Sequence, residues 1–99
     1  DAAVLQQTAC ADLPVILWSV DPEDWHVHDA DAVTAHILRH AGPGSVILMH
    51  DLTDSSVTAA LRVIDALQAQ GYEFLTVSEL AARSGTALRP GQAYCSFPP

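Results

Sequence analysis

Two short stretches decide how this chain is expected to fold: WSVDPEDW at residues 18–25 and SVILMHD at residues 45–51. In each stretch an apolar run ends abruptly in ionisable side chains, carboxylates in the first and an imidazole with a carboxylate in the second. Strands of a parallel sheet deliver ionisable groups to a shared edge in this way. The pattern therefore predicts that Asp24 and His50 meet at that edge.

Apolar periodicity along the rest of the chain predicts alternating helices and strands. Residues 3–11 repeat apolar side chains at helical spacing without a start signal, so the chain is expected to open inside a helix, as a fragment would. Short apolar runs predict three strands, over residues 14–20, 46–49 and 72–75. Amphipathic spacing predicts a helix over residues 30–41.

Two further helices are expected in the second half of the chain. Thr76 and Glu79 have capping-box spacing, which predicts a short helix through Arg83. The longer helix ends at Gly71 and can be capped by Asp54, Ser55 or Ser56. Its inner face is expected to consist of Val57, Ala60, Leu61, Ile64 and Leu67.

Strands that alternate with helices predict an α/β fold, in which right-handed crossovers feed a parallel sheet. Three strands leave both edges of such a sheet open. Continuously apolar strands are buried on both faces of a sheet, so both faces need to be covered by other elements. The unit is therefore expected to pair with further strands that the chain does not contain. Residues 1–84 are assigned to this domain, whereas residues 85–99 lack periodicity and are expected to form an irregular tail.

The chain is strongly acidic, with 12 acidic against 4 basic residues and a formal net charge of −8. Such a charge repels phosphate groups, so nucleic acids and anionic membrane surfaces are not expected as partners. No apolar stretch approaches the ~20 residues that span a bilayer, and no signal sequence opens the chain. The chain is expected to be soluble and mature.

Cys10 and Cys95 form no diagnostic spacing. They are compatible with one disulfide that ties the tail to the first helix, or with partners in a missing segment. Two buried free thiols are the alternative.

His50 is a candidate general acid if the first two strands are neighbours, because a carboxylate beside an imidazole favours the protonated ring. The alternative is that His50 only closes the end of the sheet while Asp51 and Asp54 shape the next turn. Trp25, beside Asp24, either packs at the sheet edge or offers a sugar ring a flat apolar surface.

Histidines elsewhere in the chain invite a metal hypothesis. His26, His28 and Asp29 lie close together, but a closed metal site needs about four ligands, so solvated loop histidines are expected there. His36 and His40 are one helical turn apart and are expected on an exposed helix surface. No metal ligand is assigned to this chain.

The two opening stretches resemble the fourth and fifth motifs of the NodB-type polysaccharide deacetylases, carbohydrate esterase family 4. The first matches as Trp-Ser-Val-Asp-x-x-Asp-Trp and the second as Ile-Leu-Met-His-Asp. The later sequence Gly-Tyr-x-Phe-x-Thr-Val-x-Glu-Leu, residues 71–80, is also similar to the C-terminal half of that family. The resemblance covers residues 1 to about 83.

This resemblance implies a distorted (β/α) barrel, to which the chain contributes the C-terminal three β/α units. The first three motifs of the family, which hold the catalytic base, the metal ligands and an arginine, lie upstream of residue 1. The resemblance thus implies a divalent metal cofactor, zinc, with its ligands in a missing N-terminal half of the domain, on the same or a separate chain. Activity is expected only when both halves are present.

For four residues of this chain the resemblance implies roles in deacetylation. His50 protonates the leaving nitrogen or oxygen, and Asp24 keeps its imidazole charged. Leu48 forms a wall of the acetyl-methyl pocket, and Trp25 is the aromatic residue beside it. Asp21 also matches its motif and is expected to be structural.

The implied reaction is the hydrolysis of N-acetyl or O-acetyl groups on an acetylated polysaccharide: chitin oligomers, peptidoglycan or xylan. Because these polymers are extracellular, the resemblance implies a secreted protein, in which a disulfide is permitted. Two alternatives stand beside it. One is a non-catalytic carbohydrate-binding module or inactive fragment of the same fold, and the other is the C-terminal part of an unrelated α/β-barrel hydrolase.

Overall fold

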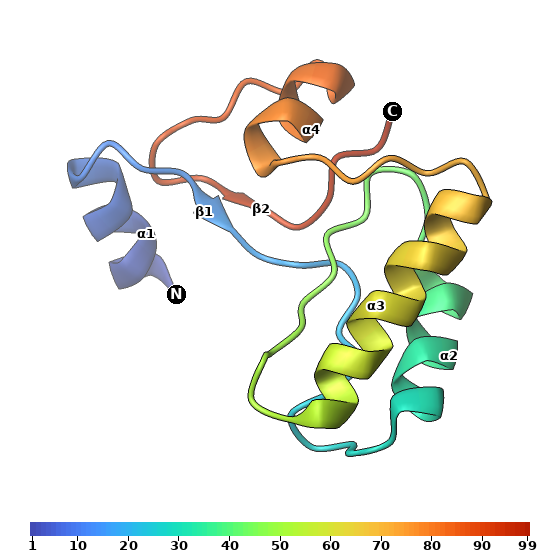
Figure 1. Cartoon of the computed structure of the whole chain (residues 1–99). Helices are drawn as coiled ribbons and strands as arrows, with labels where there is room; N and C mark the ends of the chain where they lie inside the picture. Colours follow the sequence, from blue (N-terminus) through green and yellow to red (C-terminus); the bar gives the residue numbers. More distant parts are fainter. The chain divides into compact units, whose positions relative to one another are not determined.

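A computed structural model describes all residues, 1–99, which divide into two units. The first unit comprises residues 1–19, 44–46 and 75–99, and the second comprises residues 20–43 and 47–74. The elements follow one another along the chain (Figure 1) as α1 (Ala2–Cys10), β1 (Val15–Ile16), α2 (Ala30–His40), α3 (Asp54–Ala69), α4 (Val77–Ser84) and β2 (Ala93–Tyr94). The fold is mixed α/β, with short strands.

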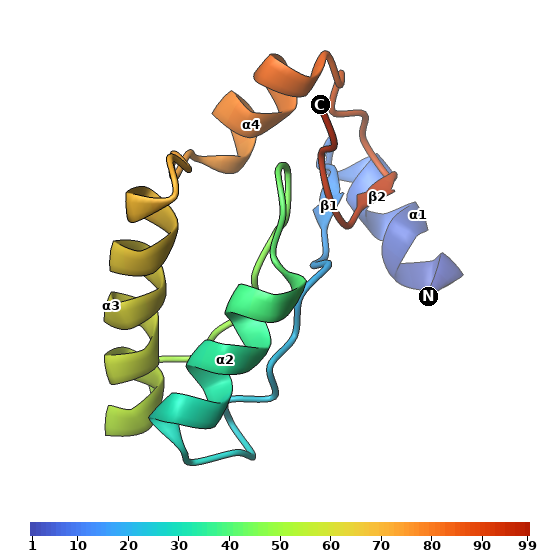
Figure 2. The same ribbon diagram turned by 90° about the vertical axis from the view of Figure 1, so that its right-hand side faces the viewer.

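The second unit is built around α2 and α3, which pack against each other (Figure 2). Its core combines apolar residues of both helices with one from the preceding segment: Val20, Val33, Ile37, Ala59, Val63 and Leu67. Asp29 begins α2, because its side chain accepts hydrogen bonds from the N–H groups of Asp31 and Ala32. The predicted helix over residues 30–41 is thereby confirmed.

α3 turns a different face to the core from the one predicted. Its buried residues are Ser56, Ala59, Val63 and Leu67, whereas three residues of the predicted inner face are exposed: Val57, Leu61 and Ile64. Both stripes contain Leu67, whose predicted burial is confirmed, but their earlier members differ by one position, about 100° around the helix axis. Periodicity alone cannot tell which of the two stripes is buried, because packing against α2 determines it.

The predicted parallel contact between the first two apolar runs forms, but over a short length. Val20 and Ile47 make a parallel bridge, and the Leu48 N–H donates to the Val20 carbonyl over 2.9 Å. Regular strands over residues 46–49 and 72–75 were predicted and are absent. A regular strand needs a neighbour along its whole length, and within the chain these segments have at most isolated bridges.

In the first unit β1 pairs in parallel with β2, Val15 opposite Ala93 and Ile16 opposite Tyr94. The strand predicted over residues 14–20 is thus found at the expected position, but it is shorter than predicted, since β1 contains only Val15 and Ile16. Irregular coil was expected for residues 85–99, and for β2 that expectation is wrong. Two paired residues are too few to leave a periodic pattern in the sequence.

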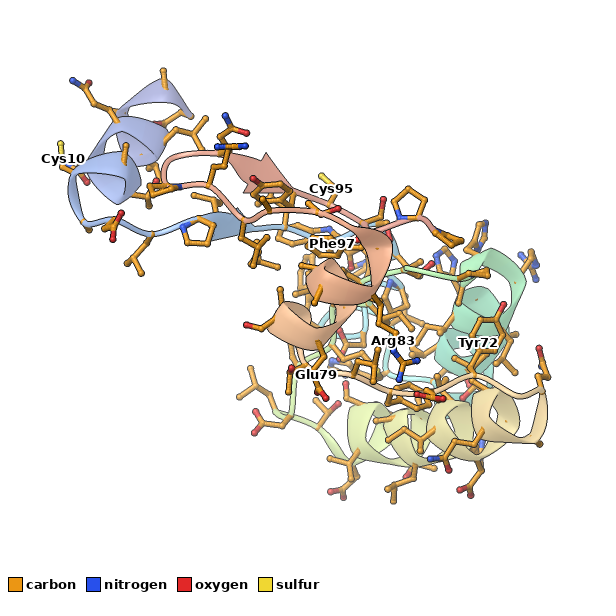
Figure 3. All side chains as sticks on the ribbon, turned by 90° about the horizontal axis from the view of Figure 1, so that it is seen from above. Cys10, Tyr72, Glu79, Arg83, Cys95 and Phe97 are labelled. Carbon is orange, nitrogen blue, oxygen red and sulfur yellow. The ribbon has the colours of Figure 1, made fainter.

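Phe97 is buried in the first unit, with 1% of its surface exposed, and is labelled in Figure 3. Its N–H donates to the Gly44 carbonyl over 2.8 Å. Gly44 adopts φ of +80°, and a Cβ atom there would collide with the carbonyl group of Phe97. Glycine is therefore required where the C-terminal segment approaches this turn.

The helix ends in the first unit follow the capping rules. Asp1 caps α1 by accepting a hydrogen bond from the Val4 N–H over 2.9 Å, so the prediction that the chain opens without a helix start is wrong. The predicted capping box of Thr76 and Glu79 at the start of α4 is confirmed.

Cys10 and Cys95 are free and exposed (Figure 3), so of the alternatives left open by the sequence, neither a disulfide between them nor two buried thiols is found in this structure. No helix of the structure has both the length and the apolar composition needed to cross a membrane.

Candidate functional site

A tight turn in the loop before α2 places Asp24. Asp21 accepts a hydrogen bond from the Glu23 N–H over 2.9 Å, and Glu23 adopts φ of +55°. The Glu23 carbonyl then accepts hydrogen bonds from the N–H groups of His26 and Val27. Asp21 thus shapes the turn, in line with its expected structural role, while the Asp24 side chain is fully buried.

The Asp24 carboxylate binds His50 at two points, which confirms the predicted contact. Asp24 Oδ1 lies 2.9 Å from His50 Nδ1, and Asp24 Oδ2 accepts a hydrogen bond from the His50 N–H over 2.8 Å. Because an ionised carboxylate can only accept hydrogen bonds, Nδ1 carries a proton and Nε2 is the ring nitrogen left for other groups. The His50 side chain is 36% exposed, so a buried carboxylate anion binds an imidazole ring that other molecules can reach.

Burial by itself would raise the pKa of the Asp24 carboxyl, because desolvation disfavours the anion. Hydrogen bonds from the His50 side chain, the His50 N–H and the Ser56 hydroxyl oppose burial and leave this pKa below its ordinary value. Asp24 is therefore anionic at neutral pH.

Ser56 is a site residue that sequence reasoning missed. It was considered only as a cap of α3, but the cap is Thr53, whose Oγ1 accepts a hydrogen bond from the Ser56 N–H over 3.3 Å. The Ser56 side chain is buried, its Oγ accepts a hydrogen bond from Thr53 over 3.0 Å, and its hydroxyl group helps to lower the pKa of Asp24. One signal could have revealed it, since Ser56 precedes Ala59 and Val63 at helical spacing on the face that meets the core.

Trp25 and Leu48 lie on the two segments that carry the Asp24–His50 pair. Trp25 follows Asp24 directly, is 55% exposed, and its ring centroid lies 5.3 Å from that of His26. Leu48 precedes His50 by two residues and is half-buried. Their predicted roles in binding the acetyl group stay predictions.

The residues of this chain do not fit a metal centre. No group of three or more histidine, cysteine, aspartate or glutamate side chains is arranged to hold an ion. Within the cluster that invited the metal hypothesis, His28 Nε2 instead lies 3.1 Å from the Trp25 carbonyl oxygen.

No family profile matches the chain. It is 40% identical over 82 residues to the peptidoglycan-N-acetylglucosamine deacetylase PgdA of Listeria monocytogenes, covering 83% of this chain and 17% of that protein. The chain thus spans less than a fifth of the length of this relative.

Solved structures agree with the sequence comparison. A structure described as T48 deacetylase with substrate superposes with a TM-score of 0.83 at 38% identity, over 95% of this chain and 45% of that one. A family 4 acetyl xylan esterase from Clostridium thermocellum, in complex with a cobalt ion, superposes with a TM-score of 0.77 at 28% identity, over 89% of this chain and 45% of that one.

These relatives and structural neighbours define a class of hydrolases, the deacetylases and esterases of carbohydrate esterase family 4. This chain is related to that family and matches the C-terminal portion of its members. The resemblance predicted from the two motifs is thus confirmed.

Proposed function

We propose that this chain is the C-terminal portion of a metal-dependent polysaccharide deacetylase domain, which hydrolyses N-acetyl or O-acetyl groups. The observation that carries this proposal is the contact between the buried Asp24 carboxylate and the accessible ring of His50. The relationship to peptidoglycan deacetylases and to an acetyl xylan esterase supports the reaction class.

In this reaction His50 acts as the general acid. Asp24 holds Nδ1 at 2.9 Å and the backbone N–H at 2.8 Å, so the ring cannot turn freely and Nε2 is directed away from the carboxylate. When the carbon–nitrogen or carbon–oxygen bond of the acetyl group breaks, the leaving atom takes a proton from Nε2. The Asp24 anion balances the positive charge of the protonated ring until that transfer.

Two neighbouring side chains complete the proposed binding site. Leu48 forms a wall of the pocket for the acetyl methyl group, and Trp25 offers the sugar an exposed aromatic face. The 55% exposure of Trp25 supports this role, because a ring buried in the core could not stack on a sugar.

The remaining parts of the site are assigned to the N-terminal half of the domain, on the same or a separate polypeptide. This chain contributes three β/α units of a distorted barrel, and the other half provides the ligands of a divalent metal ion, zinc. The cobalt ion in the related acetyl xylan esterase supports a divalent metal ion. The substrate is chitin oligomers, peptidoglycan or acetylated xylan, and the protein is secreted to reach it.

The test is acetate release by the full-length protein that contains this chain. N-acetylglucosamine oligomers, peptidoglycan and acetylated xylan are each incubated with the wild type and with His50→Ala. The variant should lose about 10²–10⁴-fold in turnover, the contribution of a positioned general acid. Metal content, measured on both proteins, should be the same because His50 is not a ligand.

Acetate release from none of the three polymers by the wild type would reject the proposed activity. Unchanged turnover of the variant, or loss of its metal, would reject the role of His50. In the second case the imidazole would belong to the metal site rather than to proton transfer.

A further inference from the structure

Two histidine side chains lie next to each other at the C-terminal end of α2. His36 and His40 are four residues apart, and residues at this spacing share one face of a helix. Their ring centroids are 4.3 Å apart, with an angle of 32° between the ring planes. His40 is exposed and His36 is half-buried, so one ligand can reach both rings from solvent.

The helix backbone holds the His40 ring in one orientation. Its Nδ1 lies 2.8 Å from the His36 carbonyl oxygen. Because a carbonyl oxygen can only accept a hydrogen bond, Nδ1 of the neutral ring carries the proton and Nε2 has a free lone pair. Histidines that bind metal ions usually donate their other ring N–H to such an acceptor, which fixes the tautomer and the direction of the ring. His40 is therefore preorganised to bind a cation through Nε2.

The His36 ring provides the second nitrogen donor. A metal ion that binds two imidazole nitrogens at about 2.0–2.1 Å each keeps the two nitrogens within about 4 Å of each other. The ring centroids are separated by a similar distance, 4.3 Å, so small rotations about the side-chain bonds bring both donors to one ion.

The spacing of the two histidines is one that binds metal ions in other proteins. In the His-Glu-x-x-His motif, two histidines four residues apart on one helix face are zinc ligands, and the glutamate acts as a general base. The sequence here is His-Ile-Leu-Arg-His, residues 36–40. It keeps the ligand spacing but has no glutamate, so it provides binding without the catalytic group.

The charge around this pair favours a cation. The last carbonyl groups of a helix lack helical partners and carry the negative end of the helix dipole. The chain as a whole has a formal net charge of −8, which raises the local concentration of cations. Arg39 opposes a cation here, but it is exposed, so water and salt screen its charge.

We propose that His36 and His40 form an open binding site for a divalent transition metal ion. Two ligands cannot enclose an ion, so water or a donor group of another molecule completes the coordination, unlike in a closed cluster of protein ligands. Imidazole suits Cu²⁺, Ni²⁺ and Zn²⁺, and Cu²⁺ binds most tightly among the first-row divalent ions. The bound ion links two successive turns of α2 and stabilises the end of this helix. The site is independent of the deacetylase function proposed above.

Titration of the full-length protein with Cu²⁺ tests this proposal. Calorimetry on the wild type and on the double variant His36→Gln with His40→Gln gives the number of ions bound, and the variant should bind one ion fewer per chain. Glutamine is a good helix former, so α2 should be retained, which circular dichroism checks. Each single substitution should weaken binding at this site at least about 10-fold, because it leaves one imidazole alone.

Electron paramagnetic resonance identifies the ligands of the ion that the double variant lacks. The difference between the wild-type and variant spectra of bound Cu²⁺ should show coupling to two imidazole nitrogens. Cu²⁺ should also raise the midpoint of thermal unfolding more in the wild type than in the double variant, since the ion binds the folded helix. Single variants at the exposed position 40 keep the test available if the double variant does not fold.

The double variant His26→Gln with His28→Gln is the matched control. It also removes two histidines that are close in sequence, but His28 Nε2 lies 3.1 Å from the Trp25 carbonyl oxygen and both residues lie in a loop. This control should bind as many Cu²⁺ ions as the wild type. Equal Cu²⁺ binding by the wild type and the variants at positions 36 and 40 would overturn the proposed site, as would loss of the ion only in the control.

Discussion

The Asp24 side chain combines complete burial with a negative charge. Removal of a carboxylate from water is costly unless hydrogen bonds replace its hydration. Two hydrogen bonds do so here, one from the ring and one from the backbone N–H of His50. Because both favour the anion, the charge stabilises the fold only while Asp24 is ionised.

Acid stability should therefore depend on Asp24. Its pKa is lowered in the folded state, whereas an aspartate in the unfolded chain titrates near 3.9. Between these two pKa values the folded state therefore binds fewer protons than the unfolded state. The stabilisation by ionised Asp24 is complete above about pH 4 and is lost as the pH falls through the lowered pKa of the folded state. Urea titrations at several pH values, on the wild type and on Asp24→Asn, measure the difference in stability.

The difference in free energy of unfolding between wild type and Asp24→Asn should be constant near neutral pH and shrink below about pH 4. A difference that stayed constant down to the lowest pH would mean that Asp24 does not carry the charge described here.

At the scale of the elements, the orientation of α3 decides both the core of the second unit and the position of Ser56. The helix presents Ala59, Val63 and Leu67 to α2 and keeps Ser56 at the inner end of the same face. A rotation of α3 by one residue would bury Val57 and carry Ser56 away from Asp24. Core packing and the candidate site therefore depend on the same orientation.

Two leucines on this helix test the orientation. Leu67 is 5% exposed and Leu61 is 61% exposed. Leu67→Ala should lower the free energy of unfolding of the 99-residue chain by about 2–5 kcal/mol. Leu61→Ala should change it by less than about 0.5 kcal/mol, as surface substitutions do. Urea unfolding followed by circular dichroism gives both values. A loss at Leu61 as large as that at Leu67 would favour the predicted inner face, which contains both leucines, over the observed one.

At the scale of the whole molecule, backbone contacts between distant parts of the chain hold the first unit together. β1 and β2 are far apart in sequence but pair directly, and the segment at Phe97 binds the turn at Gly44. These contacts place the last residues of the chain within the fold rather than outside it.

Gly44 and Gly71 form a matched pair for testing this closure, because both have positive φ, +80° and +94°. An alanine at either position costs about 1–2 kcal/mol for the left-handed backbone. At Gly44 the added methyl group also meets the Phe97 backbone, whereas at Gly71 it meets nothing within 4 Å. Gly44→Ala should therefore be more destabilising than Gly71→Ala by a further ~1–3 kcal/mol, measured by thermal and urea unfolding. Equal losses would show that Phe97 does not lie against this turn.

The sequence by itself determined the features that depend on residue type and short spacing. Apolar runs that end in Asp24 and His50 predicted the contact between them, and Thr76 with Glu79 predicted the start of α4. The same two motifs also identified the family. These predictions depend only on residues that are near one another along the chain, or on two extended segments that lie side by side.

Only the tertiary structure decided which face of α3 is buried, that Ser56 reaches Asp24, and that β2 joins β1. Each of these depends on what lies opposite in space. Two stripes of equal period compete on α3, a serine can cap a helix or donate into a core, and a strand of two residues has no periodic pattern. Packing and hydrogen bonding between distant residues select one outcome in each case.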